Sequence, residues 1–246
     1  MDPGLIAFIA LTFVLAGFVK GVIGLGLPTI AVGVLGVLMP PAAAAALMVV
    51  PSLITNIWQI AGPALVPLLR RLWPMFLALV VGVAVGAGAL AGTSANLARG
   101  LLGLALMVYA ALGLANRRPR IVPAWEPWLG PLVGLATGIV TAATGIFVIP
   151  SVPYLQALGL DKDELVQALG LSFLVATIAL AGSLVSGGTL SAGVAGSSLL
   201  ALAPALLGMW LGQRTRAAID AATFRRWFLI SLLLLGAYIA WSAFAR

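Results

Sequence analysis

The sequence contains neither histidine nor cysteine, and it is poor in charged residues. Without histidine there are no imidazole metal ligands and no histidine-based catalytic triads. Without cysteine there are no disulfides and no thiol chemistry. Only 8% of the 246 residues are charged, against about 25% in soluble domains, whereas 63% are hydrophobic. This composition predicts an integral membrane protein that holds no metal and no cofactor.

Acidic residues are the scarcest charged group. All six lie at the end of an apolar segment or in a loop, and they are Asp2, Glu126, Asp161, Asp163, Glu164 and Asp220. No carboxylate is therefore expected at membrane depth to relay protons, and only Lys20 remains for acid–base chemistry. We expect no enzyme activity. The 13 basic residues form short clusters between apolar runs, a pattern typical of membrane topology and not of nucleic-acid binding.

Apolar runs divide the chain into about eight segments, because a spanning helix needs about 20 apolar residues. Turn residues such as Pro40-Pro41 divide the two longest runs. The segments are expected near 4–38, 42–66, 73–93, 97–115, 127–158, 164–186, 190–212 and 224–244. No Lys or Arg precedes the first segment, so we expect it to remain in the mature protein and not to act as a cleaved signal peptide. The predicted fold class is an all-α polytopic membrane protein.

The first and fifth segments are longer than one crossing requires and contain helix-weakening residues. The first is interrupted over 21–28, a stretch with three glycines and Pro28, and the fifth over 141–145, with Pro150 and Pro153 following. Backbone groups freed at membrane depth must be buried in protein or line a cavity. Both segments are therefore predicted to be broken and re-entrant.

Matching glycine pairs indicate two related halves. Gly17/Gly21 and Gly134/Gly138 lie in the first segment of each half, and Gly82/Gly86 and Gly208/Gly212 in the third. Each pair alone is common in membrane helices that pack closely, but the repetition favours an internal repeat. We predict one repeat over 1–116, a basic cytoplasmic linker over 117–126 and a second repeat over 127–246.

The basic residues test the topology. If all eight segments cross the membrane, six basic loop residues lie on each side, and the positive-inside rule makes no assignment. If the fifth segment is a hairpin that returns to its own side, ten lie together, against Arg99 and Arg246, and that side is cytoplasmic. A first segment of the same kind makes the repeats inverted, as in many secondary transporters. Charge does not decide whether the first segment crosses or re-enters.

Lys20 is the one basic residue far from any predicted loop. An ionisable group in the membrane marks a substrate or ion pathway by default, although Lys20 at a segment end would be an interfacial residue. We expect the two breaks to meet near the midplane, with half-helices starting near Pro28 and Phe147 that direct anion-attracting N-termini there. The polar residues predicted around this site are Thr29, Asn56, Gln59, Thr144, Gln156, Gln167, Ser172 and Thr177.

The stretch from Gly17 to Pro28, together with the second break between Gly138 and Pro150, resembles the sulfite exporter TauE/SafE family. The resemblance implies a bacterial inner-membrane permease that exports sulfite, sulfoacetate or related organosulfur anions. The site residues that it implies are Lys20, Gly21, Gly24, Gly26, Pro28, Gly138, Gly145 and Pro150. Family members often carry a denser glycine run in the second break than the Thr141 to Ile146 stretch of this chain.

The leading hypothesis is thus an anion exporter working by alternating access, whose partners are a small anionic solute and the lipid bilayer. A permease for another anionic metabolite, such as a carboxylate, stays open, as does a membrane assembly factor without a solute pathway. Membrane potential alone can drive anion export, and a sodium site at the breaks is an alternative. The sequence does not decide whether the protein is a homodimer.

Overall fold

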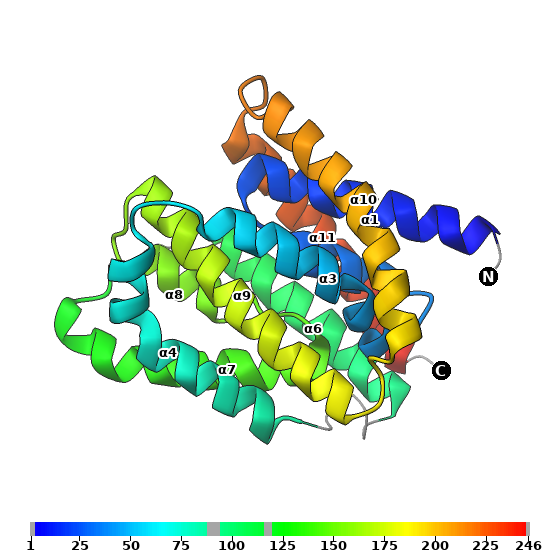
Figure 1. Ribbon diagram of the computed structural model, residues 1–246, viewed down its shortest axis with the longest axis horizontal. Helices are drawn as coiled ribbons and strands as arrows, with labels where there is room; N and C mark the ends of the chain where they lie inside the picture. Colours follow the sequence, from blue (N-terminus) through cyan, green and yellow to red (C-terminus); the bar gives the residue numbers. More distant parts are fainter. Residues whose placement is uncertain (1–2, 88–93, 116–119, 245–246) are drawn as a thin grey trace.

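The computed structural model describes residues 3–87, 94–115 and 120–244, and all regular structure in these ranges is helical. Figure 1 shows the helices in chain order. Their bounds are α1 (Pro3–Ile23), α2 (Leu27–Leu35), α3 (Pro41–Ile60), α4 (Leu65–Val85), α6 (Ala95–Leu114), a 3₁₀ turn η1 (Pro123–Trp125), α7 (Glu126–Thr144), α8 (Ser151–Ala157), α9 (Lys162–Ser186), α10 (Ala192–Thr215) and α11 (Ala221–Phe244). In the described part of the chain, eight helices are long and apolar enough to cross a membrane. The chain is a multi-pass membrane protein, as predicted.

The predicted boundaries of the second and third segments were wrong. Helix α3 ends at Ile60 and α4 begins at Leu65, so Arg70 and Arg71 lie within a helix and not in a loop. The helix tolerates them because Arg71 reaches the end of the bundle, where its guanidinium forms a 2.6 Å salt bridge with Glu126. Long basic side chains of this kind keep their charge at the interface while their stems cover apolar surface.

Glycine ends the helix before each break. Gly24 and Gly26 follow α1 with φ of +75° and +113°, and Gly145 follows α7 with φ of +75°. This left-handed conformation is strained for residues with a Cβ, so glycine terminates helices in this way. Pro28 lies in the first turn of α2, as predicted. The second half-helix, in contrast, begins at Ser151 and not near Phe147, because Pro150 occupies its N-cap position.

The glycine pairs join the two halves. Gly17 and Gly21 of α1 pack on the backbone of Ala205 and Met209 of α10, where an added Cβ would clash with their carbonyl oxygens. Residue numbers rise together along both helices, so α1 and α10 run parallel. The first segment of the first half therefore packs on the third segment of the second half.

The same packing joins α7 to α4. Gly134 and Gly138 face the carbonyls of Met75 and Leu79, and these helices are also parallel. The matching contacts make Gly82 the counterpart of Gly212, because Gly82 packs on Leu135 and Gly138 as Gly212 packs on Phe18 and Gly21. The helix contacts thus match Gly82 with Gly212, one helical turn away from the order in which the two glycine pairs occur in the sequence.

Most of the described basic residues lie at one end of the bundle. The beginning of α7 and the end of α8 meet there, because the Ile121 amide donates to the Ala157 carbonyl (3.0 Å) and Arg71 also contacts the Leu158 carbonyl (3.4 Å). The basic residues at this end are Arg70, Arg71, Arg120, Lys162, Arg214, Arg216, Arg225 and Arg226. Arg99 lies at the other end, near the start of α6. Arg117, Arg118 and Arg246, and with them the first residues of the predicted linker, lie outside the described residues.

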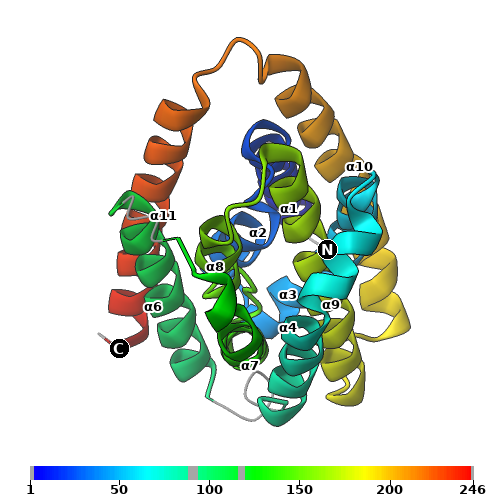
Figure 2. The ribbon, with the colours of Figure 1, turned by 90° about the vertical axis from the view of Figure 1, so that its left-hand side faces the viewer.

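The half-helices α2 and α8 occupy the centre of the bundle. In Figure 2 they lie between the α6–α11 pair and the helices α3, α4 and α9. The α6–α11 pair packs closely through Gly103 and Gly236. Pro51 lacks the amide that would bond the Leu47 carbonyl, and Ser198 of α10 donates to that carbonyl instead (2.8 Å). The breaks are thus held within protein, as irregular backbone at membrane depth must be.

Candidate functional site

Lys20 is the centre of the candidate site. It lies one turn before the end of α1, and its side chain is only 6% exposed. Its ammonium donates to Thr55 Oγ1 (3.0 Å) and to Asn56 Oδ1, both on α3. No carboxylate in the described ranges lies within ion-pair distance of it. An ammonium has three donors, so one remains, and the two acceptors that hold it are neutral.

The two acceptors are themselves oriented. The Thr55 hydroxyl donates to the Pro51 carbonyl (2.7 Å), which leaves its lone pairs for Lys20. The Asn56 amide contacts Thr177 Oγ1 on α9 (3.5 Å), and the Thr177 hydroxyl donates to the Phe173 carbonyl (2.6 Å). The ammonium is therefore held by a hydrogen-bonded network that spans α1, α3 and α9 and carries no negative charge.

A cavity of about 210 Å³ borders Lys20 at the basic end of the bundle. It is lined by Lys20, Gly21, Gly24, Thr55, Trp58, Gln59, Val166, Met209, Gln213 and Arg216. Gln59 ties the first break to α9, because its side-chain amide donates to the carbonyls of Gly24 (3.2 Å) and Val166 (3.0 Å). Its carbonyl oxygen is buried and has no hydrogen-bond partner among the described residues. The cavity thus offers two cations, amide groups and no carboxylate.

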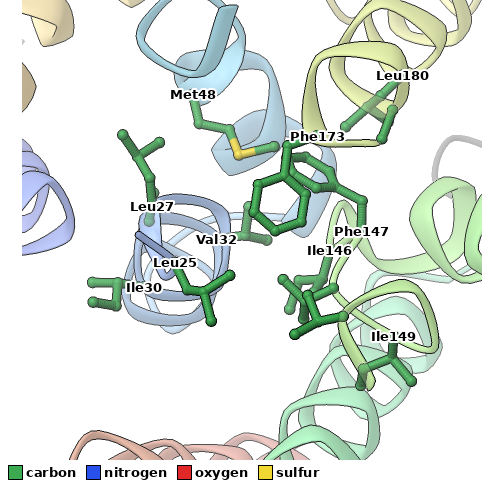
Figure 3. Close-up of a cluster of buried hydrophobic side chains, with 14 of the residues drawn as sticks. Leu25, Leu27, Ile30, Val32, Met48, Ile146, Phe147, Ile149, Phe173 and Leu180 are labelled. Atoms are coloured by element: carbon green, nitrogen blue, oxygen red, sulfur yellow. The ribbon is translucent and has the colours of Figure 1, made fainter. Parts of the chain in front are cut away.

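An apolar cluster fills the space on the other side of Lys20. Figure 3 shows side chains from both breaks packed against α3 and α9. Phe147 and Phe173 are buried with ring centroids 5.3 Å apart, and Met48 is fully buried. Met48 precedes Thr55 by seven residues, or about 10 Å along α3. The cluster separates Lys20 from the end of the bundle opposite the basic residues.

The glycine turns of the two breaks lie at different levels along α3, and the meeting of the breaks near the membrane midplane stays a prediction. The Gly24 carbonyl contacts Gln59, whereas a Cβ added to Gly145 would lie 2.9 Å from Ala45. Residues 45 and 59 of α3 are about 21 Å apart along the helix axis. One cause is that α7 continues a turn further past its glycine pair than α1 does.

The structure brings together part of the predicted site. Lys20, Gly21, Gly24 and Gln59 line the cavity, and Asn56 holds Lys20. Nearby, at the start of α2, are Gly26, Pro28 and Thr29, whose hydroxyl donates to the Gly26 carbonyl (2.9 Å).

The other predicted residues do not line the cavity. Gly138 packs on α4, Thr144 and Gly145 end α7, and Pro150 precedes α8. Gln156 contacts Arg225 at the basic end (3.4 Å), and the Gln167 side chain accepts from the Ala64 amide (3.1 Å). The Ser172 hydroxyl is buried without a partner in the described part of the chain.

Several cavity residues were missed from the sequence. They are Thr55, Trp58, Val166, Met209, Gln213 and Arg216. Thr55 adjoins the predicted Asn56 and could have been included on that ground. No feature of the sequence around Gln213 and Arg216 indicates a site there, because only the close packing of α10 on α1 brings them to Lys20.

In the described ranges, eight helices of membrane-spanning length surround a buried lysine and a cavity, an arrangement typical of polytopic membrane transporters. A family model described as sulfite exporter TauE/SafE matches residues 9–239, and the chain belongs to this family. The predicted resemblance is thereby confirmed, and with it a membrane transporter of the sulfite-exporter type. Comparison with curated proteins gave no match, and comparison with solved structures gave none either.

Proposed function

We propose that the protein exports sulfite, sulfoacetate or a similar small organosulfur oxyanion across the bacterial inner membrane by alternating access. The main support for this proposal is the environment of the Lys20 ammonium. The ammonium is buried, it is held only by neutral acceptors, and it borders a cavity that Arg216 also lines. A buried charge without a counter-charge is costly. A bound anion would supply the missing negative charge.

The substrate contacts in this proposal are the residues that line the cavity. Lys20 and Arg216 attract the anion, Gln213 and the Gly21 to Gly24 backbone surround it, and Gln59 holds the first break in place. Thr55 and Asn56 position the ammonium. Family membership supports an anionic solute of the sulfite type.

The basic end of the bundle is cytoplasmic in this proposal, because basic residues concentrate on the cytoplasmic side of membrane proteins. The cavity would then receive an anion from the cytoplasm, and the apolar cluster around Phe147 and Phe173 would close the path to the outside. This arrangement corresponds to an inward-facing state.

Alternating access would rest on two inverted repeats, 1–116 and 127–246, joined by the 117–126 linker. The parallel packing of α1 on α10 and of α4 on α7 supports this. In each pair, the first segment of one half packs on the third segment of the other half. The meeting of Ile121 with Ala157 supports a re-entrant fifth segment.

The first segment would be re-entrant in the same way, returning through α2. The contacts between α1 and α3 support this: Ile9 and Leu47 share an apolar pocket, Lys20 contacts Thr55, and the two helices therefore run in the same direction.

Membrane potential would drive the export. Moving one charge through 100 mV is worth about 2.3 kcal/mol, and a dianion would gain roughly twice that. The five acids that the structure describes lie at helix ends or in connections near the basic end, where they cannot carry a proton across the membrane.

Transport by purified protein in liposomes tests the proposal, with an imposed potential and no proton or sodium gradient. We expect sulfite and sulfoacetate flux that Lys20→Ala abolishes. Lys162→Ala, which removes a lysine at the start of α9, is the matched control and should transport normally. A flux that needs an ion gradient would exclude uniport, and full activity of Lys20→Ala would exclude the proposed site.

A permease for another small anion, such as a carboxylate, is the second candidate. It is favoured by the chemistry of Lys20, because an ammonium is a point charge that does not distinguish a carboxylate from a sulfonate by geometry. Competition by acetate and succinate against labelled sulfite separates the two. Stronger competition by the carboxylates would favour this candidate.

A further inference from the structure

The packing of the two helix pairs assigns to each residue of the α1–α10 pair a counterpart in the α7–α4 pair. Gly21 contacts the Met209 carbonyl and the Gln213 amide, and Gly138 makes the same contacts with Leu79 and Val83. Gly17 and Gly134 correspond in the same way, so one register holds over one turn of α1 and α7 and over about two turns of α10 and α4. In this register Thr137 is the counterpart of Lys20, and Thr141 is the counterpart of Gly24.

Thr137 and Thr141 are both fully buried. Their hydroxyls donate to carbonyls of their own helix, Thr137 to Val133 (2.7 Å) and Thr141 to Thr137 (2.6 Å). Such bonds satisfy a hydroxyl locally and require no partner on another helix. These hydroxyls can therefore turn toward water or a solute when the surrounding packing opens, without leaving a polar group unpaired.

We propose that Thr137 and Thr141 line the external vestibule of the outward-facing state, beside the α4–α7 pair, as Lys20 and Gly24 line the cytoplasmic cavity beside the α1–α10 pair. This inference rests on the proposed alternating access, because inverted repeats that exchange conformations expose equivalent surfaces in turn. The other cavity residues on α1 and α10 are Gly21, Met209, Gln213 and Arg216, and they correspond to Gly138, Leu79, Val83 and Gly86.

The two vestibules differ in charge. Lys20 and Arg216 line the cytoplasmic one, whereas their counterparts, Thr137 and Gly86, are neutral. Hydroxyl groups can solvate an anion through hydrogen bonds, but they do not attract it over a distance as a cation does. An anion would therefore be held more weakly at the external face, and half-saturation should require a higher concentration there than at the cytoplasmic face.

Single-cysteine labelling tests the vestibule directly, because the natural sequence has no cysteine and each introduced thiol is unique. Thr137→Cys and Thr141→Cys are treated in intact cells with a membrane-impermeant thiol reagent. Gln213→Cys, on the cytoplasmic cavity, is treated in inside-out vesicles. Ala110→Cys, at a fully buried position on α6, is the control for unspecific labelling.

We expect both threonine variants to be labelled from outside at least about tenfold faster than Ala110→Cys, because a minor state populated at the percent level still reacts. External sulfoacetate, which unlike sulfite does not react with the thiol reagent, should slow this labelling. Suppose that the unmodified protein transports sulfite and that Gln213→Cys is labelled from inside. If neither threonine position is then labelled from outside, the vestibule is overturned and the proposed function stands. Absence of transport by the unmodified protein would overturn the proposed function itself.

Discussion

At the scale of single residues, the site depends on a lysine that lacks a counter-charge. Asn56→Asp would supply one, because the new carboxylate would replace the amide oxygen that Lys20 already contacts. Two unit charges 4 Å apart attract each other by about 4 kcal/mol at an effective dielectric constant of 20. We therefore expect the variant to fold and its KM for sulfite to rise at least about tenfold, for which about 1.4 kcal/mol suffices.

Liposome flux measured against sulfite concentration checks this expectation. Gln167→Glu is the control, since it places the same new charge at another buried side-chain amide, one that does not line the cavity. An unchanged KM in Asn56→Asp would show that the Lys20 charge does not bind the solute.

The sequence predicted the residues whose signal is local. Lys20 is unusual in any apolar run, and Asn56 and Gln59 lie on one face of a helix. Arg216, in contrast, directly follows the apolar helix α10, and only the backbone contact between Gly21 and Met209 brings it to the cavity. Such contacts between distant segments leave no trace in the spacing of one sequence.

At the scale of helices, glycine determines how closely the pairs pack. A Cβ at Gly138 would clash with the Leu79 carbonyl, whereas Gly182 of α9 has nothing within 4 Å. We expect Gly138→Ala to cost about 1–3 kcal/mol by overpacking. Gly182→Ala should be neutral or stabilising by up to about 1 kcal/mol, because alanine favours the helix. Thermal unfolding in detergent measures both, and equal melting temperatures would contradict the close packing of α4 on α7.

A second expectation at this scale concerns the start of α9. Asp161 accepts hydrogen bonds from the amides of Asp163 (2.9 Å) and Glu164 (2.8 Å), and Glu164 bonds back in a capping box. Asp161→Ala should therefore lower stability by about 1 kcal/mol, whereas Asp161→Asn should lose less because asparagine also caps helices. Thermal melting of the two variants in detergent checks this, and an equal loss in both would mean that charge and not capping is responsible.

Helix number followed from the sequence because segment length and hydropathy are local properties. The helix boundaries could not be predicted from the sequence where long side chains reach beyond the membrane. Charge alone predicts that Arg70 and Arg71 lie in a loop, whereas α4 includes both. The start of α8 was placed too early because residues 146–150 are apolar and yet not helical.

At the scale of the whole molecule, the distribution of basic residues and the directions of the helices agree. Eight described basic residues share one end, and both ends of the α7–α8 segment lie there. Eight plain crossings would instead divide the basic residues equally. The positive-inside rule therefore assigns an orientation only if the fifth segment is a hairpin.

The two arrangements differ in where two exposed positions lie. Asn96 is near the start of α6, and Ala218 lies between α10 and α11. Eight plain crossings place both on the same side of the membrane, whereas the hairpin arrangement places Asn96 outside and Ala218 in the cytoplasm. We therefore expect an impermeant thiol reagent to label Asn96→Cys in intact cells and Ala218→Cys only after the membrane is opened. Because the background has no cysteine, labelling of both variants in intact cells would exclude the re-entrant fifth segment and with it the inverted repeats on which the transport cycle depends.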